Sequence, residues 1–160
     1  RCAVTKEEDA AKERTMGQKY IVPYGLYAAR CYVSPAFADN TGFDQSDYDL
    51  LVEALIHLFD HDRSAARGDM VVRGLFDFEH VGTQAETNSA QNLREARLGC
   101  AHAHELFESI AATLDDESLP PQGFGHYTVT VEGWDAQGRS SRFPGVVLHR
   151  RVDPSGGRAS

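Results

Sequence analysis

The sequence has few cysteines and no long hydrophobic run, and each shortage argues against a class of protein. Its three cysteines, Cys2, Cys31 and Cys100, form no closely spaced pair. We therefore expect reduced thiols in a cytoplasmic protein rather than a disulfide framework. No apolar stretch approaches the roughly 20 residues of a membrane-spanning helix. Neither a GxGxxG nor a GxxxxGK[ST] loop occurs, which argues against a nucleotide-binding enzyme.

Lysine is scarce, and the chain is acidic. Only Lys6, Lys12 and Lys19 are lysines among the 16 basic residues, and 24 acidic residues give a net charge of −8. This charge argues weakly against a nucleic-acid partner, although local clusters matter more than the sum. An arginine-dominated basic set suits bidentate recognition of phosphate or carboxylate. The alternative is a genome that favours arginine codons.

Hydrophobic periodicity and turn residues divide the 160 residues into alternating strands and helices. Strands are expected in four segments: 20–33, 71–79, 126–132 and 146–149. Helices are expected in two segments: 46–59 and 90–114. The other segments are expected to be a polar arm at 1–19, a polar loop within 81–99 and a disordered tail at 151–160.

This element order predicts a single α+β domain over residues 20–150. The order strand, helix, strand, helix, strand, strand is most of a ferredoxin-like arrangement, in which the helices cover one face of a sheet. An opening strand is missing from that arrangement. In the first helix Ser46 and Asp49 resemble a capping box, and Gly68 is expected to end an extra turn beyond it. Gly99 weakens the second helix.

The stretch FDHDRSAARGDM, residues 59–70, places several charges at the expected end of the first helix. One interpretation is capping, because the cations His61, Arg63 and Arg67 would complement the helix dipole there. The other is a phosphate clamp. Arg63 and Arg67 are four residues apart and would point the same way on a helix, and the small residues between them leave room for a large ligand.

A second cluster lies upstream and interleaves basic and aromatic residues. Its members are Lys19, Tyr20, Tyr24, Tyr27, Arg30 and Tyr32. This composition suits single-stranded nucleic acid, whose bases stack on aromatic rings while its phosphates pair with cations. The alternative is that the tyrosines are ordinary strand residues that pack a sheet.

The sequence gives only weak indications of a metal site. His57 and His61 would share a helix face, but Leu58 stands where an HExxH zinc motif needs glutamate. Cys100, His102 and His104 alternate, which would bring ligands together on a strand and splay them on a helix. The enzyme alternative is a metal-dependent ribonuclease that uses Asp62 with His57 or His61. A further alternative is a fragment that assembles only with protein.

Several motifs together carry a resemblance to a known family. They are MGQKYIVPYGLY at 16–27, FDHDRSAARGDM at 59–70, RGLFDFEH at 73–80, AHELFE at 103–108 and YTVTV at 127–131. With these motifs the chain resembles the backbone subunit of the type I-C CRISPR effector complex (Cascade), in the Csd subtype of the Cas-seven family. The resemblance covers nearly the whole chain, and the DRSAARG run is its most specific part.

The resemblance implies a modified RNA-recognition-motif fold, which is ferredoxin-like, and a non-catalytic role. Such subunits coat the CRISPR RNA as a helical filament and hold it for pairing with target DNA. The implied partners are CRISPR RNA, target DNA through the guide, neighbouring copies of the chain and other effector-complex subunits. No cofactor or membrane is implied. The resemblance lacks the family's N-terminal portion, so the chain is expected to be a C-terminal fragment or one piece of a divided protein.

The resemblance also implies roles for individual residues in the matched motifs. Lys19, Arg63 and Arg67 are expected to bind RNA phosphates, and Ser64 to donate a hydrogen bond to a phosphate. Tyr24 and Tyr27 are expected to stack on bases or to shape the sheet.

Four further residues near these motifs complete the predicted site. Arg14 just precedes the first matched run and is a further candidate for RNA binding. Gly17, Gly25 and Gly68 are expected to permit close approach of another backbone.

Overall fold

A computed structural model describes residues 22–62, 68–84, 89–154 and 157–158 of the chain. Its helices are α1 (Pro35–Thr41), α2 (Gln45–Ile56), α3 (Ala90–Leu98), α4 (Ala103–Glu108) and the 3₁₀ turn η2 (Phe124–His126). Its strands are β1 (Leu75–His80), β2 (Ile110–Leu114), β3 (Tyr127–Val131), β4 (Val146–Asp153) and β5 (Gly157–Arg158). No helix in these ranges is long and apolar enough to cross a membrane.

The strands form two small antiparallel sheets. One has the order β1-β4-β5, and the other pairs β2 with β3. In the first sheet Phe78 lies opposite Leu148 and Asp77 lies opposite His149. The mixture of helices and antiparallel strands is compatible with the predicted α+β class. The ferredoxin-like order is not confirmed, because the described strands do not join into one sheet.

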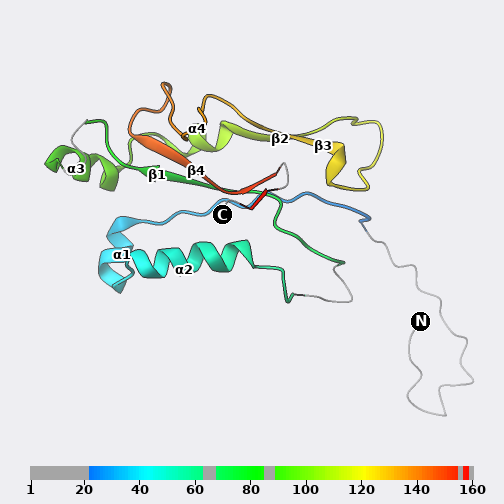
Figure 1. The fold of residues 1–160 in the computed structure, drawn as a ribbon, viewed down its shortest axis with the longest axis horizontal. Coiled ribbons are helices and arrows are strands. Elements are labelled where there is room, and N and C mark those ends of the chain that lie inside the picture. The colour runs from blue at the N-terminus through cyan, green and yellow to red at the C-terminus, as the bar shows by residue number, and fades with distance from the viewer. Residues whose placement is uncertain (1–21, 63–67, 85–88, 155–156, 159–160) are drawn as a thin grey trace, which may run out of the picture.

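The two faces of the β1–β4 ladder have different chemistry, because side chains alternate along a strand. One face carries Phe78 of β1 and the buried Val146 and Leu148 of β4. Phe78 and Val146 pack there with Leu106 of α4 and with Phe143. α3 and α4 lie on this side of the ladder in Figure 1, whereas α1 and α2 lie on the other side. Helices therefore cover both sides of the sheet, instead of the single face that the sequence predicted.

The other face is polar and holds α2 through hydrogen bonds. The Tyr48 hydroxyl of α2 donates to Oδ2 of Asp77 on β1. An Nη2 atom of Arg151 on β4 donates to the same oxygen at 3.2 Å. Burial, followed by the neighbouring Asp77 carboxylate, raises the pKa of Tyr48 to about 12. Tyr48 therefore stays a neutral donor at physiological pH, and this hydrogen bond ties α2 to the sheet.

The boundaries of α2 differ from the prediction at both ends. Asp44, and not Ser46, is the N-cap, and its side chain and that of Asp47 form a reciprocal capping box. Asp47 follows Asp44 at the spacing that this motif requires. The helix ends at Ile56 with His57 as its C-cap, so it is shorter than the predicted 46–59.

The predicted helix at 90–114 is wrong in its second half. α3 ends at Leu98, α4 is a separate short helix, and residues Ile110–Leu114 form β2. Gly99 follows α3 at a φ of +89°, in the left-handed region that favours glycine. The three- and four-residue spacing of apolar residues continues across this break, which is why periodicity alone did not reveal it.

Two other predicted segments also need correction. Residues 22–33 of the predicted strand 20–33 lie outside helices and strands. The tail was predicted to be disordered from residue 151, but β4 continues to Asp153 and pairs with Gly157–Arg158. The remaining strands are confirmed with changed boundaries, since β1 begins at Leu75 and β4 is longer than 146–149. The predicted arm at 1–19 lies outside the described residues.

Asn92 organises the connection between β1 and α3. It is 2% exposed. Its side-chain amide accepts a hydrogen bond from the backbone N–H of Gln84 at 2.8 Å and donates to the Gln84 carbonyl at 3.1 Å. Gly82 lies directly beside it, with a φ of +91°, and a Cβ there would be 2.3 Å from Asn92 Oδ1. Only glycine fits this close approach.

We predict that Leu106→Ala destabilises the fold by about 2–5 kcal/mol, because Leu106 is 2% exposed in the centre of the small core. Urea unfolding followed by circular dichroism measures this change. Leu119→Ala is the matched control, since Leu119 is 60% exposed and its removal should cost less than about 0.5 kcal/mol. Equal losses in the two variants would contradict this description of the core.

We predict that stability falls in mild acid because of His80. Burial lowers the pKa of His80 below its ordinary value of 6.5, and its Nδ1 accepts the Cys100 backbone N–H at 2.9 Å. The stabilising contribution is present above pH 6.5 and is lost as the pH falls through the folded-state pKa. His80→Asn supplies a non-titrating acceptor, so urea midpoints between neutral and mildly acidic pH should vary less than in the wild type.

The matched control for this pH dependence is His126→Asn, because His126 is exposed. This variant should keep the wild-type dependence on pH. If the urea midpoint of His80→Asn varies with pH as much as that of the wild type, other groups cause the loss of stability in acid.

Candidate functional site

The candidate site is built on the extended segment 22–33, which crosses the molecule beside α4 and β3. Pro23 and Gly25 interrupt its β-branched and aromatic sequence, which disfavours regular strand pairing. The segment carries two residues of the predicted RNA site, Tyr24 and Tyr27, and two other members of the same sequence cluster, Arg30 and Tyr32.

Phe107 of α4 is the main anchor for the C-terminal half of this segment. Its ring meets the Tyr32 ring edge to face, with centroids 5.5 Å apart. The guanidinium carbon of Arg30 lies 5.2 Å from the Phe107 centroid, within the range of a cation–π contact. Phe107 also contacts Phe78 of β1, with centroids 6.1 Å apart. The segment is therefore connected through Phe107 to the hydrophobic core.

The N-terminal half of the segment has one aromatic contact and one exposed ring. Tyr24 lies near Tyr127 of β3, with ring centroids 6.1 Å apart. Tyr27 is 81% exposed. A Cβ at Gly25 would lie 3.1 Å from the Tyr27 ring. Gly25 therefore permits close approach of the Tyr27 side chain, whereas the sequence predicted close approach of another backbone.

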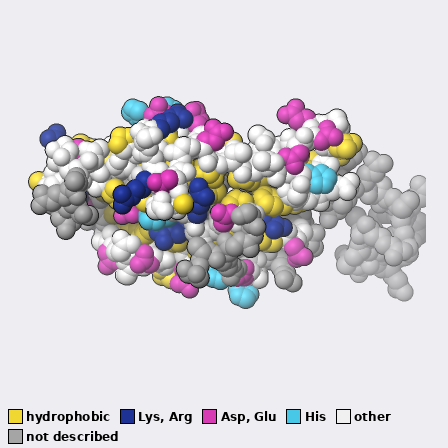
Figure 2. Space-filling view, turned by 45° about the horizontal axis from the view of Figure 1, so that its top comes forward, with side chains coloured by type: hydrophobic (Ala, Val, Ile, Leu, Met, Phe, Trp, Pro, Cys, Tyr) yellow, Lys and Arg dark blue, Asp and Glu magenta, His cyan; other side chains and the backbone are white. Residues whose placement is uncertain are grey.

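We call the set Tyr24, Tyr27, Arg30, Tyr32, Phe107 and Tyr127 the aromatic–arginine strip. A second pair of the same kind lies where Arg73, just before β1, stacks over the Phe124 ring of η2 at 5.1 Å. Rings that are exposed beside guanidinium groups can stack on planar ligands while the cations meet anions. On the face shown in Figure 2, basic side chains are interspersed with acidic ones, and hydrophobic side chains lie exposed between them.

The first predicted cluster is only partly described. Arg63, Ser64 and Arg67, like Arg14, Gly17 and Lys19, lie outside the described residues, and their predicted roles stay predictions. The helix before the cluster ends at Ile56, so His61 does not cap it, contrary to the capping interpretation. No described atom lies within 4 Å of a Cβ built on Gly68.

The candidate histidine ligands are exposed, and they pair differently from the prediction. Nδ1 of His57 lies 2.6 Å from Oδ2 of Asp60, a residue that the ribonuclease hypothesis did not use. His102 and His104 stack on each other, with ring centroids 5.7 Å apart. Within the described ranges, no group of three or more His, Cys, Asp or Glu side chains could hold a metal ion.

Sequence reasoning missed Phe107 and Tyr127, the two members of the strip that lie outside residues 22–33, and it missed the separate pair of Arg73 and Phe124. These four residues come from elements distant in sequence, and no local pattern predicts their contacts. Tyr127 falls within the predicted strand 126–132 and Phe107 within the predicted helix 90–114, but their contacts with Tyr24, Arg30 and Tyr32 are tertiary.

A comparison with protein families identifies the class of this protein. Residues 1–132 match the profile of the family described as CRISPR-associated protein Cas7. The match covers most of the chain, so the chain belongs to this family. Members of the family are backbone subunits of CRISPR effector complexes. A comparison with curated proteins returned no match.

We predict that Phe107→Leu loosens the extended segment, because it removes the ring that contacts both Tyr32 and Arg30. Limited digestion with trypsin, followed by mass spectrometry, should show faster cleavage after Arg30. Phe124→Leu is the matched control, since it removes a ring that contacts Arg73 and not this segment. Cleavage after Arg30 at the wild-type rate would contradict the anchoring role of Phe107.

Proposed function

We propose that this Cas7-family protein is a non-catalytic backbone subunit that binds CRISPR RNA in a type I-C (Csd) effector complex. In this proposal copies of the chain coat the guide as a filament. They hold it for pairing with target DNA, beside the other subunits of the complex. The membership of the Cas7 family supports the general role, and the resemblance of the quoted motifs supports the subtype.

The observation that carries the RNA-binding part of the proposal is the aromatic–arginine strip. Tyr27 and Tyr32 are 81% and 71% exposed, and Arg30 lies between them in the sequence. Single-stranded RNA presents unstacked bases and a phosphate at each nucleotide. The exposed rings are suited to the bases, and the guanidinium is suited to the phosphates.

The chain's negative charge limits how RNA can bind. With a net charge of −8, the whole surface does not attract RNA, so affinity has to come from local arginine groups and from stacking. In this proposal Lys19, Arg63 and Arg67 add phosphate contacts to those of the strip. Because only a few specific cations bind the phosphates, we expect the RNA affinity to fall measurably but not steeply as the salt concentration rises.

We predict that Tyr27→Ala weakens binding of single-stranded CRISPR RNA by about 1–3 kcal/mol, as the loss of one stacked base implies. Fluorescence anisotropy of the purified chain with labelled RNA measures the affinity. Phe37→Ala is the matched control, because Phe37 is an aromatic residue of α1 that is 73% exposed and lies outside the strip. Equal affinities of the wild type and Tyr27→Ala would remove Tyr27 from the site.

We predict that Arg30→Ala, Arg63→Ala and Arg67→Ala each lower the slope of log affinity against log salt by about one unit. The same anisotropy assay, repeated across salt concentrations, gives this slope. Arg94→Ala removes an exposed arginine of α3 and serves as the control. If Arg63→Ala and Arg67→Ala leave RNA affinity unchanged, the phosphate-clamp assignment is wrong, and a role in protein assembly alone is favoured.

A further inference from the structure

α2 has a second apolar stripe that faces away from the sheet. Its half-buried residues, which include Tyr48, Val52 and Leu55, lie on the sheet side. Leu50, Leu51 and Ala54 lie on another side, and Leu58 follows just beyond the end of the helix. The three leucines are 64%, 38% and 51% exposed. A helix that is apolar on more than one side usually has a second surface packed on it.

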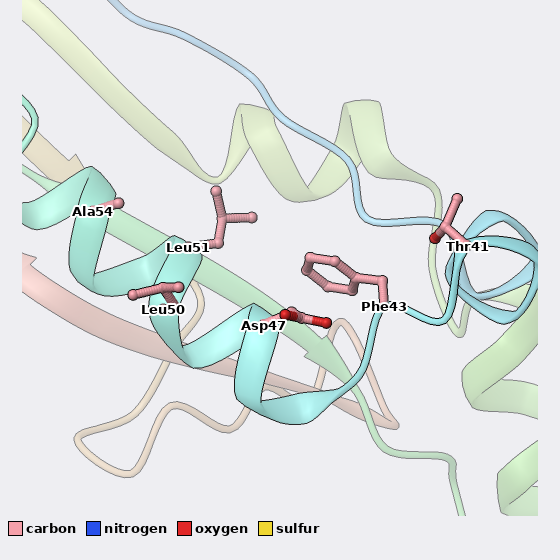
Figure 3. A pocket seen from close by; sticks show the side chains of 6 residues that line it. All are labelled: Thr41, Phe43, Asp47, Leu50, Leu51 and Ala54. Atoms are coloured by element: carbon pink, nitrogen blue, oxygen red, sulfur yellow. The ribbon is translucent and has the colours of Figure 1, made fainter.

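This second stripe borders a shallow hollow, which Figure 3 shows from close by. The hollow lies between α2 and the connection from α1, and it is lined by Thr41, Phe43, Asp47, Leu50, Leu51 and Ala54. The Phe43 ring points toward Leu51, and the Asp47 carboxylate lies at the rim beside it. The hollow thus combines an apolar floor with an acidic edge.

The helix beside the hollow carries charge of a single sign. From Asp44 to Ile56 the sequence contains no Lys, Arg or His, whereas Asp44, Asp47, Asp49 and Glu53 are acidic. Asp39 of α1, by contrast, is paired with Arg97 of α3. In the described structure the hydrogen bonds to Asp44, Asp47 and Asp49 come from uncharged donors. Hydrogen bonds from the Ser46 side chain and from the Asp47 and Ser46 N–H groups lower the pKa of Asp44. Asp44 therefore keeps its negative charge to a lower pH than an ordinary aspartate does.

We propose that the hollow beside α2 is a docking surface for a basic amphipathic segment of another protein. Such a segment presents leucine-like side chains to Leu50 and Leu51, and it presents Lys or Arg to the acidic rim. The acidic rim repels nucleic acid. It would also repel the same acidic rim of a second copy that docked through this surface. The hollow shares no lining residue with the aromatic–arginine strip, so the inference goes beyond the RNA-binding proposal.

Two labelled amphipathic helical peptides of about 18 residues, or five turns, test this proposal. They share one leucine face, and their polar faces carry only Lys in one peptide and only Glu in the other. Fluorescence anisotropy with the full chain should show binding of the Lys peptide and at least about tenfold weaker binding of the Glu peptide. Equal binding of the two peptides would overturn the charge-matched part of the proposal.

Two variants locate the binding surface. Leu50→Ser should weaken binding of the Lys peptide by about tenfold or more, as the loss of one buried leucine contact implies. Leu119→Ser, which removes an equally exposed leucine outside the hollow, should leave it unchanged. Glu53→Lys should weaken binding of the Lys peptide and strengthen binding of the Glu peptide. Lys-peptide binding that is unaffected by Leu50→Ser and Glu53→Lys would place it elsewhere and overturn the proposal.

Two further measurements distinguish docking of a basic segment from docking of a second copy and from RNA binding in the hollow. Sedimentation velocity should show the same mass for the wild type and Leu50→Ser. A wild-type dimer that Leu50→Ser dissociates, without peptide binding, would assign the hollow to a second copy and overturn the proposal. RNA affinity should be unchanged in Leu50→Ser, so a failure of the RNA-binding proposal and a failure of this one are distinguishable. An RNA affinity that falls in Leu50→Ser would place RNA in the hollow and overturn the proposal.

Discussion

The antiparallel pairing of β1 with β4 is the constraint on which the rest of the structure depends. Because side chains alternate along these strands, the register that faces Phe78 and Leu148 toward the core also faces the pair Asp77 and His149 away from it. A slip by one residue would exchange the two faces and bury the charges. The ladder thus fixes both the hydrophobic layer under α4 and the polar layer that binds α2.

The two layers hold their helices in different ways, and α4 and α2 border different candidate surfaces. α4 is held by burial of Leu106, and its Phe107 extends this packing to the segment that carries Tyr32 and Arg30. α2 is tied to the sheet by the hydrogen bond from Tyr48 to Asp77 and by half-buried residues such as Val52 and Leu55, and none of its residues is fully buried. For a Cas7-family subunit, this arrangement leaves one surface rich in rings and arginine and another that is apolar and acidic.

Local sequence patterns predicted much of the secondary structure but little of its assembly. β3 and the middle of α2 follow from alternation and helical spacing, because each pattern lies within one element. The break at Gly99 was missed because α3, α4 and β2 continue one apolar spacing. Residues 20–33 have strand-like composition, yet tertiary contacts with Phe107 and Tyr127 decide the conformation of 22–33. Tyr24 and Tyr27 were identified as candidates from composition, whereas their partners are distant in the sequence and leave no local signal.

The buried amide of Asn92 has a consequence for how this region tolerates change in evolution. Asn92 binds the backbone of Gln84 through both atoms of its amide, and its own N–H donates to the Ser89 hydroxyl. Asn92 therefore holds Gln84 and Ser89 in place relative to one another. Lengthening a connection between two fixed points costs only the slowly growing entropy of closure. Insertions between Gln84 and Ser89 would leave these hydrogen bonds and the sheet intact.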